Sequence, residues 1–315
     1  MNWPLLGQIR LERPAGSMRV PDDFLRCVAF IAEVVHQDTA GKSLDHQATG
    51  FIATVPSSAR RGTSYPFFVT AKHAAAHLVG KNLEIVINDK SGGVSSLSVM
   101  GTSWYVHPSD ESVDAVVIPC ILNSQLDVMS VNTEASFLTK DLMRDKKIGI
   151  GDEVFTVGLF SPTGNLKRNT PIVRYGTIAM LPEEPIQVAN GFAEVYLIEA
   201  RSLGGLSGSP VFVRQTLAVD GGEDNRGKQR SLCGASSDGM LLGLAHGHWD
   251  TRESDLNKPS FVHDSQRGVN LGIAVVVPAH KILEIINQPR LIALREMFEA
   301  QIRKDLSPGP DAGIE

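Results

Sequence analysis

Three side chains that lie far apart in the sequence are of the types that together can hydrolyse an acyl bond. His73 follows the apolar stretch "FFVTAK", Asp114 precedes the β-branched stretch "AVVIP", and Ser207 lies within "GGLSGSPVF". A serine hydroxyl is a poor nucleophile at neutral pH unless an imidazole takes its proton during the attack. The imidazole in turn needs an acceptor on its other nitrogen, which fixes its tautomer and stabilises its cation. One serine, one histidine and one aspartate are therefore the minimum set for this chemistry.

Glycines crowd Ser207 on both sides, with Gly204 and Gly205 before it and Gly208 directly after it. Glycine is used where the backbone must adopt unusual dihedrals or let another group approach closely. We therefore expect this loop to present backbone amides to a bound group. The string alone is a weak signal, because GxSG recurs by chance in glycine-rich chains, so its context must decide.

The elements that must position these residues are predicted to be strands. Short apolar stretches rich in Val, Ile and Phe alternate with Gly, Pro, Asn and Asp, and they fall into two series: 24–35, 48–55, 66–70, 82–88 and 113–119, then 152–160, 171–181, 193–200, 210–213, 240–246 and 269–277. Helix-length periodic stretches between them are missing, which favours antiparallel barrels or sandwiches over a βαβ sheet. The more polar stretch 123–150 separates the two series, so the sequence predicts an all-β chain of two similar domains.

The predicted boundaries are set by these two series. An N-terminal extension covers 1–23, a first β domain with His73 and Asp114 covers 24–135, and a second with Ser207 covers 136–278. Apolar residues at helical spacing predict a helical segment over 279–306, interrupted at Pro289. We expect 307–315 to be a flexible tail and the polar stretch 214–239 to be a loop.

Composition excludes several classes of function. The net charge is −5 and no long basic run occurs, so a nucleic-acid surface is not expected. Cys27, Cys120 and Cys233 lie far apart without CxxC spacing, which favours small buried hydrophobes over a zinc site or disulfides. No apolar stretch has the pattern of a signal peptide or the length of a membrane span. These features predict a cytoplasmic protein with no membrane partner.

Taken together, the three motifs resemble those of the trypsin-like serine peptidases with the double β-barrel fold. "VTAKHAAA" is similar to that family's histidine turn, "VDAVVIP" to its aspartate strand and "GGLSGSPVF" to its nucleophile loop. Within the family, "IGIGDEVFTVGLF", "RYGTIAML" and "NLGIAVVVPAHKIL" resemble framework segments of bacterial HtrA-like and glutamyl-endopeptidase-like members. The resemblance spans roughly residues 24 to 290. It implies two six-stranded antiparallel β-barrels with a C-terminal helix.

The resemblance also implies roles for the residues. His73 would be the general base and then the acid, Asp114 its orienting carboxylate, and Ser207 the nucleophile of a serine endopeptidase acting on protein or peptide substrates. The backbone N–H groups of Gly205 and Ser207 would stabilise the oxyanion, and losing one such donor typically costs about 2.7–4 kcal/mol. Gly208 and Pro210 would lead the chain into the next strand. No metal or organic cofactor is implied.

Departures from the family carry their own expectations. Ala74 stands where many secreted relatives have a disulfide cysteine, which is typical of a reducing compartment. Leu206 stands where trypsin has an aspartate that pairs with a new N-terminus, so activation by trimming is not expected. No PDZ-type domain is expected after the barrels. We therefore hypothesise a regulatory protein partner that contacts the 214–239 loop or the C-terminal helix, and equal activity with and without it would contradict this.

Substrate preference is a further hypothesis from the resemblance. Arg201 and Ser202 would form the floor of the pocket for the residue before the scissile bond, and 244–249 one wall. Arg201, His246 and His248 could pair with a carboxylate, which predicts cleavage after acidic residues. The alternative is that Arg201 points to solvent or pairs with a structural carboxylate, and the pocket takes small or apolar side chains.

The same residues permit other interpretations. The α/β-hydrolase elbow requires GxSxG, but Ser209 occupies the last position, and the order of the motifs also disagrees. His73 and His77 have the spacing of metal ligands, yet the glutamate of HExxH is absent. "HGH" at 246–248 could also suggest a metal site, but we prefer other roles for these histidines. Asp110 lies close enough to Asp114 to be confused with it, although Asp114 directly abuts the strand. A catalytically silent binding module on the same fold is the alternative to an enzyme.

Overall fold

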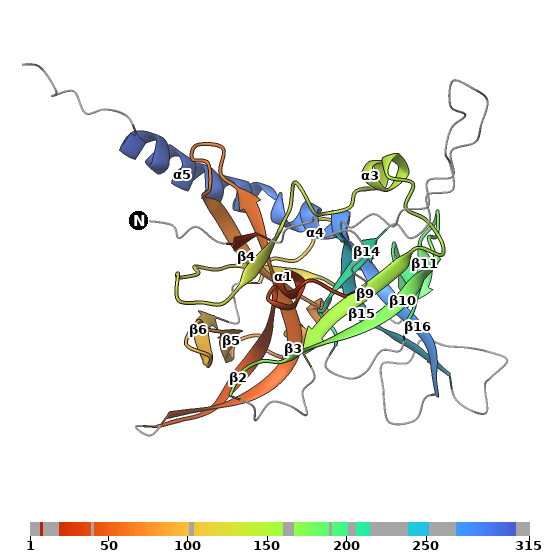
Figure 1. Cartoon of the computed structure of the whole chain (residues 1–315), viewed down its shortest axis with the longest axis horizontal. Coiled ribbons are helices and arrows are strands. Elements are labelled where there is room, and N and C mark those ends of the chain that lie inside the picture. The colour runs from red at the N-terminus through yellow and green to blue at the C-terminus, as the bar shows by residue number, and fades with distance from the viewer. Residues whose placement is uncertain are drawn as a thin grey trace, which may run out of the picture.

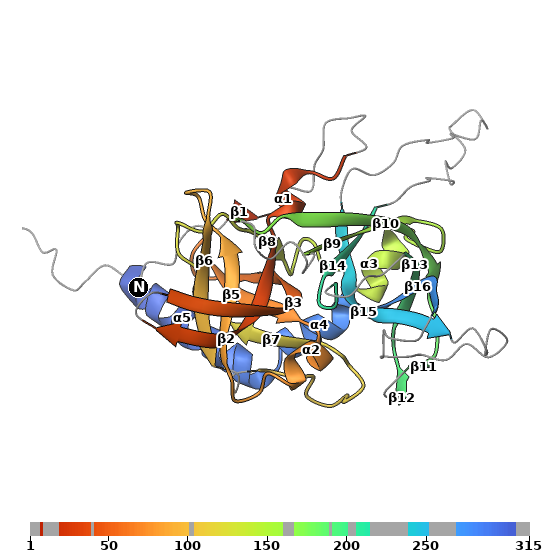
Figure 2. The ribbon, with the colours of Figure 1, turned by 90° about the horizontal axis from the view of Figure 1, so that it is seen from below.

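The computed structural model describes residues 7–8, 19–38, 41–100, 104–159, 167–188, 191–200, 206–214, 239–251 and 269–306. These residues form two β-rich halves that lie side by side (Figures 1 and 2). The predicted tail at 307–315 and all but the ends of the 214–239 loop lie outside the described residues.

The C-terminal half is a closed barrel of six antiparallel strands, in the order β10-β13-β16-β15-β14-β9. Its strands are β9 (Glu153–Leu159), β10 (Pro171–Met180), β13 (Tyr196–Glu199), β14 (Pro210–Arg214), β15 (Met240–Thr251) and β16 (Val269–Pro278). A short hairpin of β11 (Ile186–Val188) and β12 (Gly191–Ala193) stands apart from the barrel. The predicted six-stranded antiparallel barrel is confirmed for this half.

The N-terminal half is an eight-stranded sheet, in which β1-β8-β3-β2-β5-β6 form one path and β4 pairs with both β3 and β7. Its strands are β1 (Gly7–Gln8), β2 (Val28–Asp38), β3 (Gly41–Pro56), β4 (Ser64–Thr70), β5 (Asn82–Asn88), β6 (Val94–Met100), β7 (Val116–Pro119) and β8 (Met129–Asn132). The described strands of this half do not close into a second ring. Two pairings, β1 with β8 and β3 with β8, are parallel, which a barrel of consecutive hairpins would not contain.

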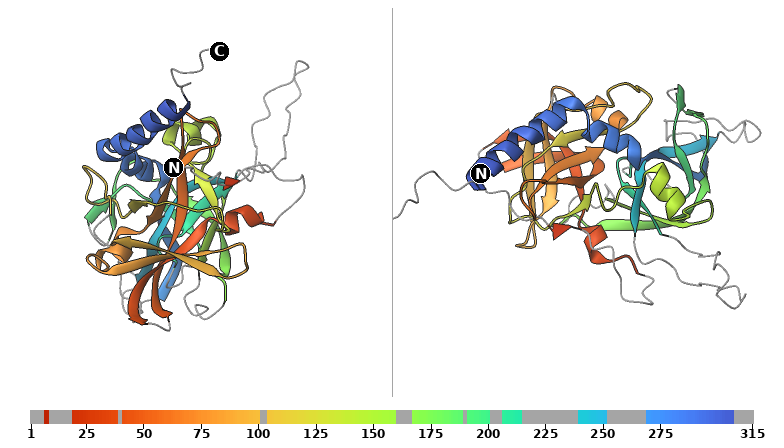
Figure 3. Two further views of the ribbon diagram at one scale, coloured as in Figure 1. Left: turned by 90° about the vertical axis from the view of Figure 1, so that its left-hand side faces the viewer. Right: turned by 90° about the horizontal axis from the view of Figure 1, so that it is seen from above.

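Five helices complete the described chain: α1 (Asp22–Leu25), α2 (Lys72–Ala76), α3 (Lys140–Asp145), α4 (Ala279–Ile286) and α5 (Pro289–Leu306). The predicted C-terminal helix is confirmed, with its break at Pro289, which begins α5. Figure 3 shows α4 leaving the C-terminal barrel and α5 running over the N-terminal half. Glu299 holds α5 there, because its carboxylate accepts from the backbone N–H of Ala59 at 2.7 Å and from the Tyr65 hydroxyl at 2.9 Å. None of the described helices combines the length and apolar character that a membrane span needs.

One hydrophobic cluster runs through both halves of the molecule. Phe24 of α1 packs edge-on against Phe155 and Phe212 of the C-terminal barrel, with ring centroids 5.3 and 4.7 Å away. Cys27 and Cys120 are buried free thiols, as predicted, and burial raises the pKa of Cys120 to about 12. A shared cluster fixes how the halves meet, and the candidate site lies where they meet.

Candidate active site

His73 is positioned by a buried strand and a short helix. All seven residues of β4 are buried, and Ala71 then has the extended conformation that ends the strand before α2 begins at Lys72. His73 is therefore in the first turn of α2, as the sequence predicted, and its side chain is 25% exposed. Strand β4 anchors the backbone, and the imidazole reaches the surface between the halves.

Asp114 lies just before β7 and contacts His73 through both carboxylate oxygens. Its Oδ1 accepts from the His73 backbone N–H at 2.7 Å, and its Oδ2 is 2.6 Å from His73 Nδ1. A carboxylate only accepts, so the shared proton belongs to Nδ1 and Nε2 is left as the acceptor, which is the tautomer a general base requires. Burial alone raises the pKa of Asp114, but hydrogen bonds from His246 and His73 outweigh it and hold that pKa far below its usual range. Asp114 is thus a permanent anion at neutral pH.

Ser207 lies in a tight loop that packs against the end of β4. Gly208 has a φ of +89°, and its N–H donates to the carbonyl of Ala245 at 2.8 Å. A Cβ at Gly208 would lie 2.0 Å from Thr49 O and 2.5 Å from Thr70 Oγ1, and Thr70 is three residues before His73. The loop thus packs against β3 and against the end of β4 that leads to His73, and β14 begins at Pro210 as predicted.

The Ser207 hydroxyl is half-buried and donates to the backbone carbonyl of His246 at 3.2 Å. Ser209, the other serine of the loop, has a side chain with 0% exposure. Of the two hydroxyls, only that of Ser207 is therefore accessible to a substrate.

His246 contributes a contact that the sequence did not predict. Its Nδ1 forms a short hydrogen bond with Asp114 Oδ2, the same oxygen that His73 contacts. The two imidazole rings lie edge to face, with centroids 5.1 Å apart, and the His246 residue is 5% exposed. The resemblance assigns this side chain to a specificity pocket, but in the structure its ring is directed at the carboxylate behind His73.

The remaining candidate residues lie away from this cluster or outside the described part of the chain. Gly205, Arg201 and Ser202 lie outside the described residues. His248 pairs with Ala274 of β16, and its side chain is not described. His77 is the exposed residue that ends α2.

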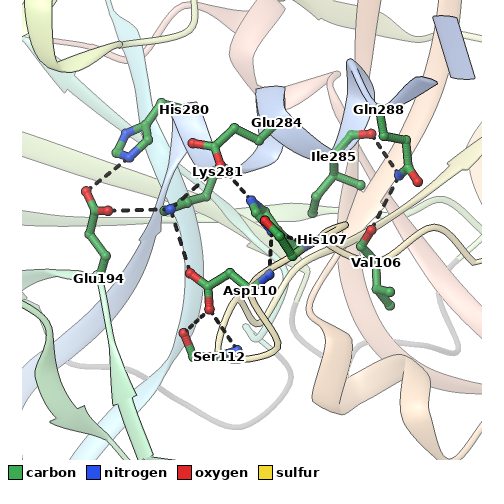
Figure 4. Close-up of polar contacts among 11 residues, drawn as sticks. Val106, His107, Asp110, Ser112, Glu194, His280, Lys281, Glu284, Ile285 and Gln288 are labelled. Atoms are coloured by element: carbon green, nitrogen blue, oxygen red, sulfur yellow. Dashed lines mark hydrogen bonds and ion pairs between the residues drawn. The ribbon is translucent and has the colours of Figure 1, made fainter.

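Lys281 of α4 holds the loop that carries Asp114. Its Nζ lies 3.5 Å from Glu194 Oε2, 3.7 Å from Asp110 Oδ2 and 3.7 Å from Glu284 Oε2 (Figure 4). Glu194 belongs to the C-terminal half, whereas Asp110 belongs to the loop that leads to Asp114. The 13%-exposed lysine therefore ties that loop to the other half of the molecule.

His107 fixes the same loop from within. Its Nδ1 accepts from the backbone N–H of Asp110 at 3.0 Å, so its proton is on Nε2, which donates to Glu284 Oε2 at 2.7 Å. Asp110 also accepts from the backbone N–H of Ser112 at 3.0 Å (Figure 4). Asp110, the alternative to Asp114, is thus engaged with its own loop and Lys281 and not with His73.

His73, Asp114 and His246 also form a group of possible metal ligands, with ligand atoms within 4.8 Å of one another. Ligands that share a tetrahedral zinc ion at about 2.0 Å each lie about 3.3 Å apart. The 2.6 Å between His73 Nδ1 and Asp114 Oδ2 is shorter and is the length of a charge-assisted hydrogen bond. The spacing within the group therefore fits shared protons better than a shared cation.

No protein-family model and no curated protein sequence matches the chain. Solved structures do match, among them the MamO protease domain from Magnetospirillum magneticum, with 13% identity, a TM-score of 0.47 and coverage of 84% of this chain and 98% of that one. Deg5 matches with 14% identity, a TM-score of 0.45 and coverage of 83% and 88%. The inactive form of the Rv3671c protease, from M. tuberculosis, matches with 14% identity, a TM-score of 0.42 and coverage of 84% and 89%. The chain is similar to structures of trypsin-like serine protease domains, including HtrA/Deg-type members.

Proposed function

We propose that this chain is a serine endopeptidase that works through His73, Asp114 and Ser207. The observation that carries the proposal is the pair of contacts between Asp114 and His73, one to the ring at 2.6 Å and one to the backbone at 2.7 Å. They hold the imidazole with Nε2 as the acceptor, and of the two described serines of the nucleophile loop only Ser207 exposes its hydroxyl. This combination is what nucleophilic catalysis by serine requires.

In the proposed reaction, the Ser207 hydroxyl rotates from the His246 carbonyl to His73 Nε2 as a substrate carbonyl arrives. Oγ attacks the carbonyl carbon, its proton passes to Nε2, and the Asp114 carboxylate stabilises the imidazolium that forms. The proton then passes from Nε2 to the leaving amine, and an acyl-enzyme remains. Water, activated by the same imidazole, releases the acyl group and restores the serine.

The oxyanion of each tetrahedral intermediate needs donors that are already in place. We propose the backbone N–H groups of Gly205 and Ser207 for this role, because Gly208 turns the chain sharply after the nucleophile and packs the loop against β3 and β4. Donors that are in place before the reaction cost no reorganisation when the charge develops. The substrate is a protein or peptide, and none of these steps uses a metal or an organic cofactor.

A fluorophosphonate probe tests this function, because it reacts with a serine only when a neighbouring base and oxyanion donors activate it. We expect the wild type to be labelled and Ser207→Ala to remain unlabelled. Ser209→Ala is the matched control, since it removes a buried hydroxyl from the same loop, and it should be labelled like the wild type. A wild type that stays unlabelled over a range of pH would support the alternative, a silent binding module on this fold.

Preference for acidic residues before the scissile bond is a separate hypothesis. It rests on Arg201 and His248, because the ring of His246 is engaged with Asp114. A panel of peptides that differ only at this position should give the highest kcat/KM with Glu or Asp, and Arg201→Gln should remove the preference. Faster cleavage after Leu, Ala or Lys would eliminate the hypothesis. Control by a partner protein likewise stays a hypothesis from the sequence.

A further inference from the structure

We propose that His246 is a positioning residue of the active site, which shares the Asp114 carboxylate with His73 and so sets the lower pH limit of activity. The inference rests on the proposed peptidase function and adds a fourth member to its machinery. It starts from the position of His246 within β15 and from the two contacts that this position creates.

A β-bulge places His246 where it can reach both sides of the site. Ala245 pairs with Val276 of β16, but Gly247 pairs with Val275, so the register shifts at His246. Bulges of this kind re-aim a side chain and a carbonyl away from the regular ladder. Here the His246 ring is directed at Asp114 and its carbonyl at the Ser207 hydroxyl, so one residue contacts both the orienting carboxylate and the nucleophile.

The negative charge of the Asp114 carboxylate interacts with two imidazole rings, those of His73 and His246. Asp114 Oδ2 accepts from Nδ1 of His73 and from Nδ1 of His246. A carboxylate oxygen that accepts two hydrogen bonds interacts less strongly with each donor than it would with one. Without the His246 donor, Oδ2 would serve His73 alone and would stabilise the protonated form of that ring more strongly. Protonated His73 cannot act as a base, so activity would fail at a higher pH.

The other charged groups around His246 do not account for a change in the pH at which activity fails. Ser112, Asp114, Glu194 and His246 line one small cavity, and Glu194 also contacts Lys281 and Lys140. Burial raises the pKa of Glu194, but the hydrogen bond from Lys140 and the charges of His280, Lys140 and Lys281 outweigh it and hold that pKa below its usual range. Glu194 and Asp114 therefore keep their negative charges as the pH falls toward the acid limb of activity.

The test compares the pH profile of kcat/KM in the wild type, His246→Ala and His246→Asn. We expect the acid limb of His246→Ala to move to higher pH by about one unit, the scale of one hydrogen bond to a charged group, which is about a tenfold fall at a fixed acidic pH. His246→Asn can place an amide N–H near the position of Nδ1, so its limb should stay close to that of the wild type. Profiles that superimpose for all three proteins would overturn the proposal.

A second measurement does not depend on activity. In the wild type, proton NMR should show two low-field imidazole N–H resonances, from the two rings on Asp114, and His246→Ala should retain only that of His73, shifted further downfield. An unshifted His73 resonance would show that the carboxylate is not shared. This measurement separates the two proposals. If the probe does not label the wild type but the His73 resonance shifts in His246→Ala, the peptidase function alone is refuted. If the wild type is active but the His73 resonance does not shift in His246→Ala, the role of His246 alone is refuted.

Discussion

Replacing Asp114 by Asn is expected to lower kcat/KM by about 10⁴-fold while the fold is retained. Asn has the shape of Asp but only one accepting oxygen, whereas Asp114 accepts at both: Oδ2 from the two imidazole rings and Oδ1 from the His73 backbone N–H. If the amide NH₂ faces the rings, His73 must accept on Nδ1 and carry its proton on Nε2, where it cannot take a proton from Ser207. If the NH₂ faces the backbone, two donors oppose each other.

Asp110→Asn is the matched control for this prediction. Asp110 is four residues away, and it contacts Ser112 and Lys281 rather than His73. We expect its removal to loosen the loop and to lower kcat/KM by at most about tenfold. Steady-state kinetics on one peptide substrate compare Asp114→Asn with Asp110→Asn, and circular dichroism checks that both variants are folded. Equal losses in both variants would mean that the loop as a whole, and not the carboxylate at Asp114, supports catalysis.

The local positions of His73, Asp114 and Ser207 could be predicted from the sequence. Each of them lies next to an apolar stretch whose composition indicates a buried strand. "SYPFFVT" is entirely buried as β4, so the small residues after it had to form a turn, and His73 had to lie within that turn. "VVIP" forms β7 two residues after Asp114, and "PVFVR" forms β14 three residues after Ser207. Hydrophobic runs of strand length fix where strands begin and end.

The N-terminal sheet contains elements that such patterns cannot predict. The stretch 123–150 is polar enough to be interpreted as a link between two domains, yet it contains β8 and α3. The four residues of β8, "MSVN", carry a weak strand signal, and β8 exists because β1 and β3 pair with it in parallel. Its partners are distant in sequence, so its formation depends on tertiary structure that local propensity does not contain.

The position of the His246 ring could not be predicted for a related reason. Alternation along β15 places residues on one face or the other, and a single bulge reverses that assignment for every later residue of the strand. The bulge lies between Ala245 and Gly247, and its one local signal in "LAHGHW" is Gly247, because glycine inside a strand often marks a bulge. Only the register with β16 reveals that the ring is directed at Asp114.

Gly208→Ala is expected to lower both the free energy of unfolding and the activity, because it combines backbone strain with a steric clash. The φ of +89° is one that side-chain-bearing residues rarely adopt, which costs about 1–2 kcal/mol. The added Cβ would also lie 2.0 Å from the carbonyl oxygen of Thr49 and 2.5 Å from the hydroxyl of Thr70. Both threonines are fully buried and hydrogen-bonded to each other, so neither can move aside cheaply. Overpacking of this kind adds about 1–3 kcal/mol.

Gly92→Ala separates the two costs, since Gly92 has a φ of +94° but nothing within 4 Å of its absent Cβ. Urea denaturation should show a loss of about 1–2 kcal/mol for Gly92→Ala and about 2–5 kcal/mol for Gly208→Ala. Thr49 also accepts from the backbone N–H of Leu159 at 3.1 Å, so a methyl group pressing on it disturbs the junction of the two halves. Any folded Gly208→Ala protein must then have displaced Ser207 from His73, and its probe labelling should be lost although both side chains remain. Equal stability losses in the two variants, with labelling retained, would show that the nucleophile loop is not held by this contact.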